Sequence, residues 1–458
     1  MSLDAFVANI RTQFTLDRDQ LERVVAGLTG ELMHGLSARG NTQNPSYITS
    51  LPHGNETGTY LAIDVGGSNL RVAAVQLLGE GRVEVVQHKH SILDSVKTGS
   101  AENLFGWIVE KTEALLQQIR AAGKHEDQYQ MGVVWSFPLE QTGVNKGAIL
   151  EMGKGFTVVN EILGLDLGEQ LQKGFDAKGL PIRVSALLND TVGTLVAHAY
   201  QNPLTTVGII FGTGTNAAYI ERTQNIPKLK ECADLVTDPS SDRMILNTEW
   251  DIFGSAEYLP LTKYDVELDK ESTIPGFQAF EKMCSGMYLG EITRRVLIDA
   301  VKQGLLFSGN VPAGFEKAFQ FQTAFMSTIE SDVSEELSTT RQLLEENFRF
   351  EQSPALKDLQ VVREIVRIIG DRSANLLGAA TVSLLRREEE IGIIGQEGPI
   401  VLGITGSLYE LYPNFEERTR RSIITLLGQE KNDRIEIGIA MDGGCVGAAI
   451  AAMLGSKK

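Results

Sequence analysis

Residues 59–77, TYLAIDVGGSNLRVAAVQL, constrain the fold of this chain more than any other stretch. Apolar residues alternate up to Asp64, and they alternate again after Asn69. A period of two is typical of half-buried strands, so the pattern predicts a β-hairpin. Its turn consists of Gly66, Gly67, Ser68 and Asn69.

A turn of this composition suits a phosphate group. Adjacent glycines let backbone N–H groups approach an anion, and Ser68, Asn69 and Arg71 add donors around it. Asp64 would repel such a ligand unless Mg²⁺, or water held by it, lies between them. The alternative is a plain hairpin closed by the same residues.

A second stretch repeats the design. Residues 206–221, TVGIIFGTGTNAAYIE, place Gly212 and Gly214 between two apolar runs, followed by Thr215 and Asn216. Two such hairpins indicate a duplication, with two similar halves facing each other across a cleft. Each half would offer a glycine turn to one polyphosphate, and closure of the halves would exclude water.

Composition limits the partners of the chain. Its 458 residues include 42 basic and 59 acidic side chains, a net charge of −17, which argues against nucleic acid or an anionic membrane as the main partner. Cys232, Cys284 and Cys445 lack CxxC spacing, so neither a disulfide framework nor a zinc site is favoured. No signal peptide or membrane span is recognisable, and we expect a cytoplasmic protein.

The remaining elements are predicted from apolar spacing. The first fourteen residues are expected to form a capping helix, and residues 15–37 a second helix with Thr15 as its N-cap. A polar loop is expected after Pro138, and residues 313–390 are expected to be mostly helical. Strand, glycine turn and helix are predicted at 399–421 and again at 435–454.

Two nucleotide-binding motifs can be rejected. The GTGTNA segment superficially matches a dinucleotide fingerprint, but the AAYIER that follows alternates like a strand where that motif requires a helix. No GxxxxGK[ST] sequence occurs, so the chain has no P-loop.

Polar residues at strand ends are the candidates for chemistry. Asp190 follows an apolar strand and precedes a helix, so it is either a helix cap or a catalytic carboxylate, and the hairpin directly after it favours catalysis. Ser136 ends another strand, and Lys154 lies between Gly153 and Gly155, where a cation suits a phosphate or a hydroxyl-rich ligand.

Further acceptors lie downstream. Asn247 and Glu249 lie just before Trp250, and Glu281 falls in the first turn of a predicted helix spanning residues 280–297. Each glutamate alone fits a solvated surface, but with Asn189, Asp190 and Asn216 they form the acceptor-rich set that a polyhydroxyl ligand requires. His88 and His90 share a strand face without further ligands, which favours a surface strand over a metal site.

These motifs resemble the hexokinase family, in the same order, from about residue 45 to 454. The match rests on LAIDVGGSNLRV, SFP with GKGF, LLNDTVGTL, GTGTNAAYIE, NTEW, FEKMCSGMYLGE and ITGSLYELYPNF. The resemblance implies an α/β protein with the duplicated actin-like (ribonuclease H-like) ATPase fold, whose two domains close over sugar and Mg·ATP. Residues 59–200 plus 440–458 would form the small domain, and 1–58 plus 201–439 the large one.

The resemblance also implies roles for individual residues. Asp190 would be the base for the sugar 6-hydroxyl, with Lys154 and Arg71 as further catalytic residues, and Mg²⁺ would arrive with ATP and lie near Asp64 through water, without a direct protein ligand. The sugar would be held by Ser136, Lys154, Asn189, Asp190, Asn216, Glu249 and Glu281. The nucleotide would contact Asp64, Gly66, Gly67, Ser68, Asn69, Thr213, Gly406, Ser407 and Leu408.

One departure from the family pattern concerns the sugar. Glucose-specific members show Trp-Thr-Lys-Gly-Phe where this chain has Met152-Gly153-Lys154-Gly155-Phe156. Loss of the threonine would weaken glucose binding by about 1 to 2 kcal/mol and admit a bulkier substituent. WSFP with GKG also resembles the fungal N-acetylglucosamine kinases of this fold. N-acetylglucosamine is therefore the expected substrate, and glucose, mannose or fructose the alternative.

The second departure is Asp442-Gly443-Gly444-Cys445-Val446-Gly447, where the family has Asp-Gly-Ser-Gly. This change would affect the nucleotide pocket or a domain hinge. It leaves open a third possibility, a catalytically weak sugar-sensing regulator. Both a monomer and a homodimer remain compatible with the sequence.

Overall fold

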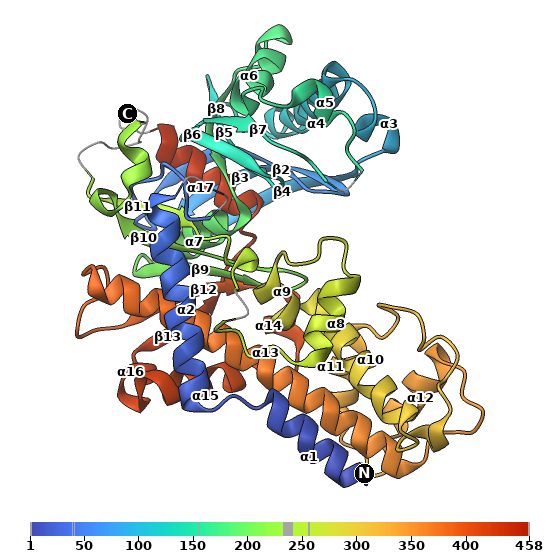
Figure 1. The fold of residues 1–458 in the computed structure, drawn as a ribbon. Helices are drawn as coiled ribbons and strands as arrows, with labels where there is room; N and C mark the ends of the chain where they lie inside the picture. Colours follow the sequence, from blue (N-terminus) through green and yellow to red (C-terminus); the bar gives the residue numbers. More distant parts are fainter. Residues whose placement is uncertain are drawn as a thin grey trace.

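Two β-sheets with helices packed on them form the framework of the protein (Figure 1). The computed structural model describes residues 2–38, 40, 42–153, 155–231, 241–254 and 257–456. The long helix α13 (Leu356–Glu390) runs along the lower part of the molecule in the view of Figure 1.

The first sheet has the strand order β4-β3-β2-β5-β8. Strands β2, β3 and β4 are antiparallel neighbours, whereas β2, β5 and β8 run parallel. The predicted hairpin of residues 59–77 is therefore confirmed, with Asp64 directly opposite Arg71. The strands are β2 (Thr57–Val65), β3 (Asn69–Gly79), β4 (Arg82–Ser91), β5 (Tyr129–Trp135) and β8 (Ile182–Leu188).

The second sheet repeats this topology. Its order is β1-β11-β10-β9-β12-β13, again with an antiparallel run, β11-β10-β9, followed by the parallel strands β12 and β13. The predicted duplication and the second hairpin are thus confirmed, and the strand after GTGTNA bears out the rejection of a dinucleotide-binding motif. The strands are β1 (Asn44–Pro45), β9 (Thr205–Phe211), β10 (Thr215–Arg222), β11 (Arg243–Asn247), β12 (Ile400–Thr405) and β13 (Ile435–Ile439).

Two helices connect the sheets. Helix α17 (Cys445–Ser456) packs on β2, β5 and β8, and α7 (Asp190–Gln201) packs on β9 and on α17. The helices cross at glycines, because a Cβ on Gly447 would lie only 2.3 Å from the carbonyl oxygen of Gly193. A Cβ on Gly193 would lie 2.0 Å from the carbonyl oxygen of Gly443. The glycines of this segment therefore serve close backbone packing.

Helices cover the outer faces of both sheets. Helix α4 packs on β3 and α6 on β8, which closes a separate apolar core on that side of the first sheet. Helix α13 packs against α1, α2, α10 and α15. The bounds of these helices are α1 (Leu3–Phe14), α2 (Arg18–Ser37), α4 (Ala101–Ala121), α6 (Leu167–Ala177), α10 (Gly286–Lys302) and α15 (Phe415–Leu427).

The predicted helix over residues 15–37 begins later than expected. Thr15 is the C-cap of α1, and Asp17 is the N-cap of α2. The Asp17 side chain accepts from the backbone N–H of Gln20, whose side chain in turn accepts from the N–H of Asp17, and this capping box fixes the start at Arg18.

Two further predictions of local structure were wrong. The segment after Pro138, expected to be a loop, forms the hairpin of β6 (Leu139–Gly143) and β7 (Lys146–Ile149). The helix expected over 280–297 is broken at Ser285 into α9 (Ala279–Cys284) and α10. The N–H groups of Gly286 and Met287 bond to the carbonyl oxygens of Gly212 and Thr213 at 2.8 and 2.9 Å, so the glycine turn takes the donors of the broken helix.

The division of the chain into two domains stays a proposal. We propose residues 59–200 plus 440–458 as one domain, because α17 returns to the first sheet, and 1–58 plus 201–439 as the other, because β1 pairs with β11 and both N-terminal helices pack on α13. Among the described residues, no helix is long and apolar enough to cross a membrane.

Candidate active site

Asp190 is the first residue of α7, and only Asn189 separates it from the end of β8. The capping function belongs to its neighbour, because the Asn189 side chain accepts from the backbone N–H of Thr191 at 2.8 Å. The carboxylate of Asp190 acts on Glu249, whose pKa it helps to raise. Folding therefore brings Asp190 close to Glu249, 59 positions later in the sequence.

A chain of amides leads from β10 to Glu249. Asn216 Nδ2 donates to Asn247 Oδ1 at 2.9 Å, and Asn247 Nδ2 donates to Glu249 Oε1 at 2.5 Å. Burial, followed by the charge of Asp251, raises the pKa of Glu249 well above its usual range. Glu249 adopts a left-handed backbone conformation, with φ of 49°, just before the 3₁₀ turn η4 (Trp250–Ile252).

Glu281 lies against the turn of the second hairpin. Its Oε2 accepts from the backbone N–H of Thr215 at 3.0 Å, and its Oε1 accepts from Gln278 Nε2 at 3.1 Å. A Cβ on Gly214 would lie 2.6 Å from Oε2, so a larger residue there would displace the Glu281 carboxylate. Burial raises the pKa of Glu281 to about 7, although the hydrogen bond from Thr215 and the charge of Lys282 lower it.

Two residues of this cluster escaped the sequence analysis. Gln278 Nε2 donates to both Asp251 Oδ2 and Glu281 Oε1, each at 3.1 Å. The signal in the sequence was spacing alone: Asp251 lies two residues after Glu249, and Gln278 lies three before Glu281, about one helical turn. Neither position stood out by composition.

The first hairpin carries an ion-pair network. Arg71 Nε donates to Asp64 Oδ2 at 2.8 Å, and Arg71 Nη1 donates to the carboxylate of Asp442 at 2.9 and 3.1 Å. Burial raises the pKa of Asp64, although the charge of Arg71 opposes the shift. The predicted phosphate donor Arg71 is thus held by two carboxylates. The turn itself is closed by a bond from Gly66 N–H to the carbonyl oxygen of Asn69 at 3.0 Å.

Glycine backbone lines the side of the second turn that faces α14 (Ser407–Leu411). A Cβ on Gly212 would lie 3.2 Å from the amide nitrogen of Ser407, and one on Gly406 would lie 2.4 Å from the carbonyl oxygen of Phe211. Gly406 has a φ of 130° and precedes the short helix α14, in which Leu408 is buried. Thr213, between these segments, is exposed. A cradle of bare backbone fits the phosphate chain of a nucleotide.

The loop around Lys154 is described only in part, because Lys154 lies outside the described residues, as does Cys232. Phe156 packs on Phe137 with the ring centroids 5.0 Å apart, and Ser136 donates its backbone N–H to the carbonyl oxygen of Val65 at 3.0 Å. Ser136 therefore lies beside the end of the strand that carries Asp64. A Cβ on Gly153 would meet no atom within 4 Å.

Among the described residues, no three or more His, Cys, Asp and Glu side chains are grouped so that they could hold a metal ion. His88 and His90 both lie on β4, with their ring centroids 6.1 Å apart. This agrees with the interpretation of that segment as an ordinary strand.

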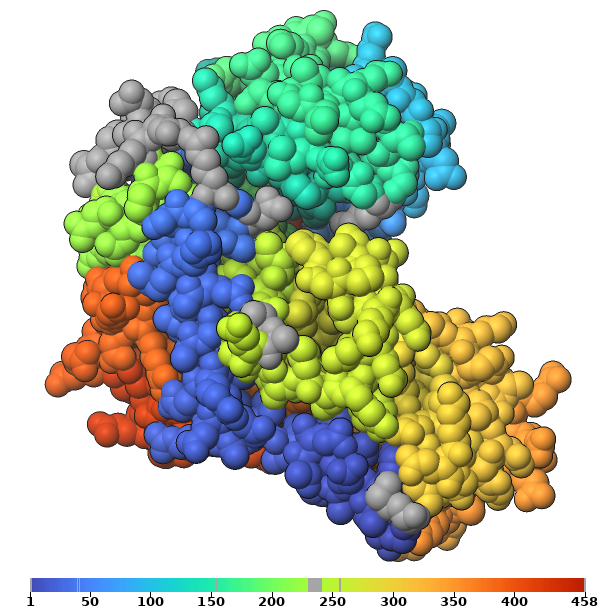
Figure 2. All heavy atoms as spheres, viewed as in Figure 1, coloured from blue at the N-terminus to red at the C-terminus, as the bar shows by residue number. Residues whose placement is uncertain are grey.

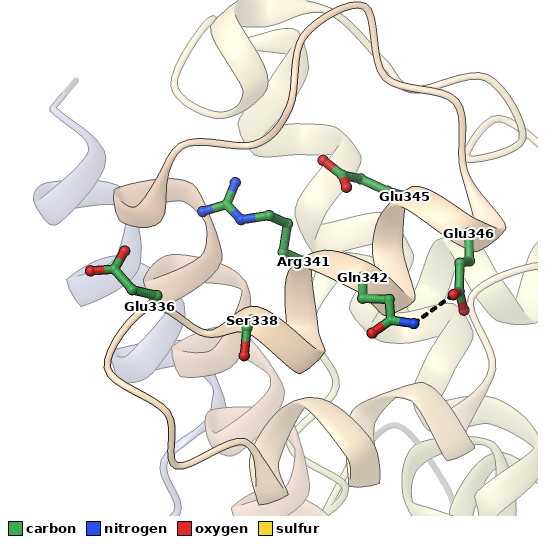
Figure 3. Close-up of a pocket in the computed structure, with 6 residues that line it drawn as sticks. All are labelled: Glu336, Ser338, Arg341, Gln342, Glu345 and Glu346. Carbon is green, nitrogen blue, oxygen red and sulfur yellow. Dashed lines mark hydrogen bonds between the residues drawn. The ribbon is translucent and has the colours of Figure 1, made fainter.

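Hollows in the surface also occur far from these residues. Two of them, of about 350 and 610 Å³, lie along α12 (Ser338–Asn347), at the opposite end of the molecule from the first sheet in Figure 1. Figure 3 shows that Gln342 and Glu346 there bond to each other. None of the predicted site residues lines either hollow. Figure 2 shows an indentation of the surface where the teal part meets the yellow-green part.

Two family models, both described as Hexokinase, match residues 6–200 and residues 206–454. Together they span nearly the whole chain.

Individual relatives cover the chain from end to end. It is 35% identical to a glucokinase of Aspergillus niger, covering 98% of this chain and 97% of the relative, and 35% identical to Hexokinase-1 of Schizosaccharomyces pombe, covering 100% and 92%. Among solved structures, a hexokinase from Schistosoma mansoni complexed with glucose matches with a TM-score of 0.82 and 31% identity, covering 99% of this chain and 100% of that chain.

Proposed function

This chain belongs to the hexokinase family, and from that membership we propose that it transfers the γ-phosphoryl group of ATP to the 6-hydroxyl of glucose or a closely similar hexose. The protein is a hexokinase, a sugar 6-kinase. What we propose beyond this activity is that the sugar is glucose or a similar hexose and that the residues named below bind it and the nucleotide. The observation that supports this proposal best is the set of carboxylates and amides gathered around Asp190, Asn216, Glu249 and Glu281.

The sugar side of the site consists mainly of hydrogen-bond acceptors. Carboxylates and amide oxygens accept from hydroxyl groups, and a hexose presents one on nearly every carbon. We assign the sugar to Ser136, Lys154, Asn189, Asn216, Glu249 and Glu281, and we add Gln278 because its amide contacts Glu281.

The ATP side consists of the two glycine turns and Gly406. Gly66, Gly67, Ser68 and Asn69 on one half, and Thr213, Gly406, Ser407 and Leu408 on the other, would hold the nucleotide. We expect Asp64 to contact Mg²⁺ through a water molecule. The hydrogen bonds from Arg71 all reach its Oδ2 atom, so that contact would be made at Oδ1. A Mg²⁺ ion bound with ATP would neutralise phosphate charge there.

The chemistry then requires little from the protein beyond placement. Asp190 would accept the proton of the 6-hydroxyl as its oxygen attacks the γ-phosphorus and the bond to the β-phosphate oxygen breaks. Arg71, by exchanging Asp442 for a phosphate oxygen, and Lys154 would stabilise the charge on the transferred group. Closure of the two halves would exclude water, which is the competing acceptor.

The names of the relatives favour glucose. They are glucokinases and hexokinases, and the solved relative holds glucose. The expectation of N-acetylglucosamine, which rested on Gly153 in place of threonine, finds no support among them. Open space at Gly153 is compatible with either sugar, because a missing threonine leaves room without creating a contact.

A substrate panel tests the proposal. ADP release is measured with glucose, mannose, fructose and N-acetylglucosamine as acceptors at saturating Mg·ATP. We expect glucose to give a kcat/KM at least tenfold above N-acetylglucosamine. The reverse order would show that N-acetylglucosamine is the preferred substrate. Transfer to none of the four sugars would contradict the proposed substrate class.

A further inference from the structure

Asp251 is a carboxylate to which the proposed reaction assigns no role, yet it contacts the sugar-binding cluster. Its Oδ2 accepts from Gln278 Nε2 at 3.1 Å. Its Oδ1 is buried and makes no hydrogen bond within the part of the chain that the structure describes. A buried acceptor without a donor is costly unless a neighbouring carboxyl carries a proton. Glu249 is that neighbour, because a side-chain hydrogen bond between the two carboxyls contributes to the pKa shifts of both.

Gln278 ties Asp251 to Glu281. An amide nitrogen has two hydrogens, and both carboxylates accept from this one nitrogen. Gln278 is itself held in a left-handed conformation, with φ of 58°, at the start of α9. Asp251 therefore fixes the orientation of the amide, and the amide fixes that of Glu281.

Few cations offset the negative charge here. Glu249, Asp251 and Glu281 lie together, and Asp190 adds its charge to Glu249. On α9, Lys282 pairs with Asp269, with Nζ 2.7 Å from Oδ1, and its charge offsets the raised pKa of Glu281 only in part. On the neighbouring elements, Glu31 of α2 accepts from the N–H of Gly254, and Tyr288 of α10 is a neutral phenol.

Carboxylates gathered in this way do not all ionise at neutral pH. Burial and then the charge of Asp251 raise the pKa of Glu249, and burial raises the pKa of Asp251. The charge of Asp251 also contributes to the raised pKa of Glu281, although burial is the larger cause. A proton therefore stays on the cluster at a pH where isolated carboxyls have lost theirs.

We propose that Asp251 is a positioning residue of the sugar site: it shares a proton with Glu249 and aligns Glu281 through Gln278, so that hexose binding weakens as the site is acidified. This inference rests on the proposed function, in which both glutamates accept from sugar hydroxyls. Each proton added to either glutamate removes an acceptor that the sugar needs.

Asp251→Asn separates charge from shape. The asparagine keeps an oxygen that accepts from Gln278 but removes the charge that acts on both glutamates. The carboxyls of Glu249 and Glu281 then lose their protons more readily, and sugar binding should persist to lower pH. Asp251→Ala removes the acceptor as well and should weaken binding at every pH, a loss that asparagine restores.

The measurement is KM for glucose and kcat from pH 5.5 to 8.5 in wild type, both variants and Glu257→Gln, an exposed carboxyl that serves as the control. In wild type KM should rise below neutral pH. In Asp251→Asn the rise should begin at a lower pH, so that KM at pH 6 is at least threefold below wild type, with the change on KM rather than on kcat. Superimposable KM profiles for wild type and Asp251→Asn would overturn the proposal.

Sugar binding can also be followed without turnover. Trp250, whose indole N–H donates to Thr215 Oγ1 at 2.9 Å, lies next to Asp251, so we expect its fluorescence to change when glucose binds. The dissociation constant should show the same shift in pH dependence. If wild type binds glucose but transfers no phosphoryl group, the proposed function fails while this titration still decides the function of Asp251. Thermal unfolding of each variant shows that it is folded.

Discussion

The backbone N–H of Thr215 donates to Oε2 of Glu281 at 3.0 Å. Thr215 directly follows the glycine turn proposed for the nucleotide, and Glu281 is proposed for the sugar. One hydrogen bond thus joins the two substrate sides of the site. Because the same turn also accepts from Gly286 and Met287, α9 and α10 are held against it. If these assignments hold, the relative position of sugar and phosphate is set largely by residues of the proposed large domain.

Glu281→Gln should stabilise the protein while weakening catalysis. Burial raises the pKa of Glu281 from 4.5 to about 7, so the carboxyl ionises more readily in the unfolded chain than in the folded protein. The stability that this carboxyl contributes is therefore fully present below pH 4.5 and is lost as the pH rises through 7. Removing the charge should add up to about 3 kcal/mol to the unfolding free energy at pH 8. Denaturant unfolding at pH 8 and pH 4.5 checks this, with no gain expected at the lower pH. A variant that is less stable at pH 8 would contradict the prediction.

Asp190→Asn should remove turnover and keep sugar binding. An amide has nearly the shape of the carboxylate but cannot accept the hydroxyl proton, and general-base catalysis contributes about 10²- to 10⁴-fold. We expect kcat to fall by that factor, while the glucose dissociation constant from Trp250 fluorescence stays within a few-fold. Normal turnover in this variant would show that another group is the base.

Gly447→Ala should destabilise the crossing of α17 and α7. The added methyl group would lie 2.3 Å from the carbonyl oxygen of Gly193, and the backbone cannot yield without moving a helix. Overpacking of this kind costs about 1 to 3 kcal/mol. Thermal unfolding measures the loss. The matched control is Gly106→Ala in α4, where the new methyl meets nothing within 4 Å, and a small gain of up to about 1 kcal/mol is expected.

Gly153→Thr should improve glucose binding. Its Cβ position is open and its φ lies outside the left-handed region, so threonine fits without strain. The added hydroxyl supplies a contact of about 1 to 2 kcal/mol, which lowers KM for glucose about five- to thirtyfold. Gly153→Ala, which has the Cβ but no hydroxyl, is the control. Equal KM values for the threonine and alanine variants would show that the hydroxyl does not reach the sugar.

The sequence determined the parts of the fold whose cause is local. Period-two alternation around glycine turns identified both hairpins, and their repetition identified the duplication that the two sheets confirm. The position of Asp190 between a strand and a helix could also be predicted, because strand, polar residues and helix follow one another along the chain. These features depend on neighbours within a few residues, and such neighbours leave a pattern that can be recognised.

Only the tertiary structure decided which distant residues meet. Apart from their spacing, nothing in the sequence marks Asp251 or Gln278, because the bond from Gln278 to Asp251 joins segments that only folding brings together. The same holds for the bond between Arg71 and Asp442, 371 residues apart, and for the break at Ser285, where the glycine turn takes the donors of a helix that sequence alone predicts to be continuous. Contacts across long separations are selected by packing and by the satisfaction of buried polar groups over the whole molecule, and no local pattern of residues encodes that selection.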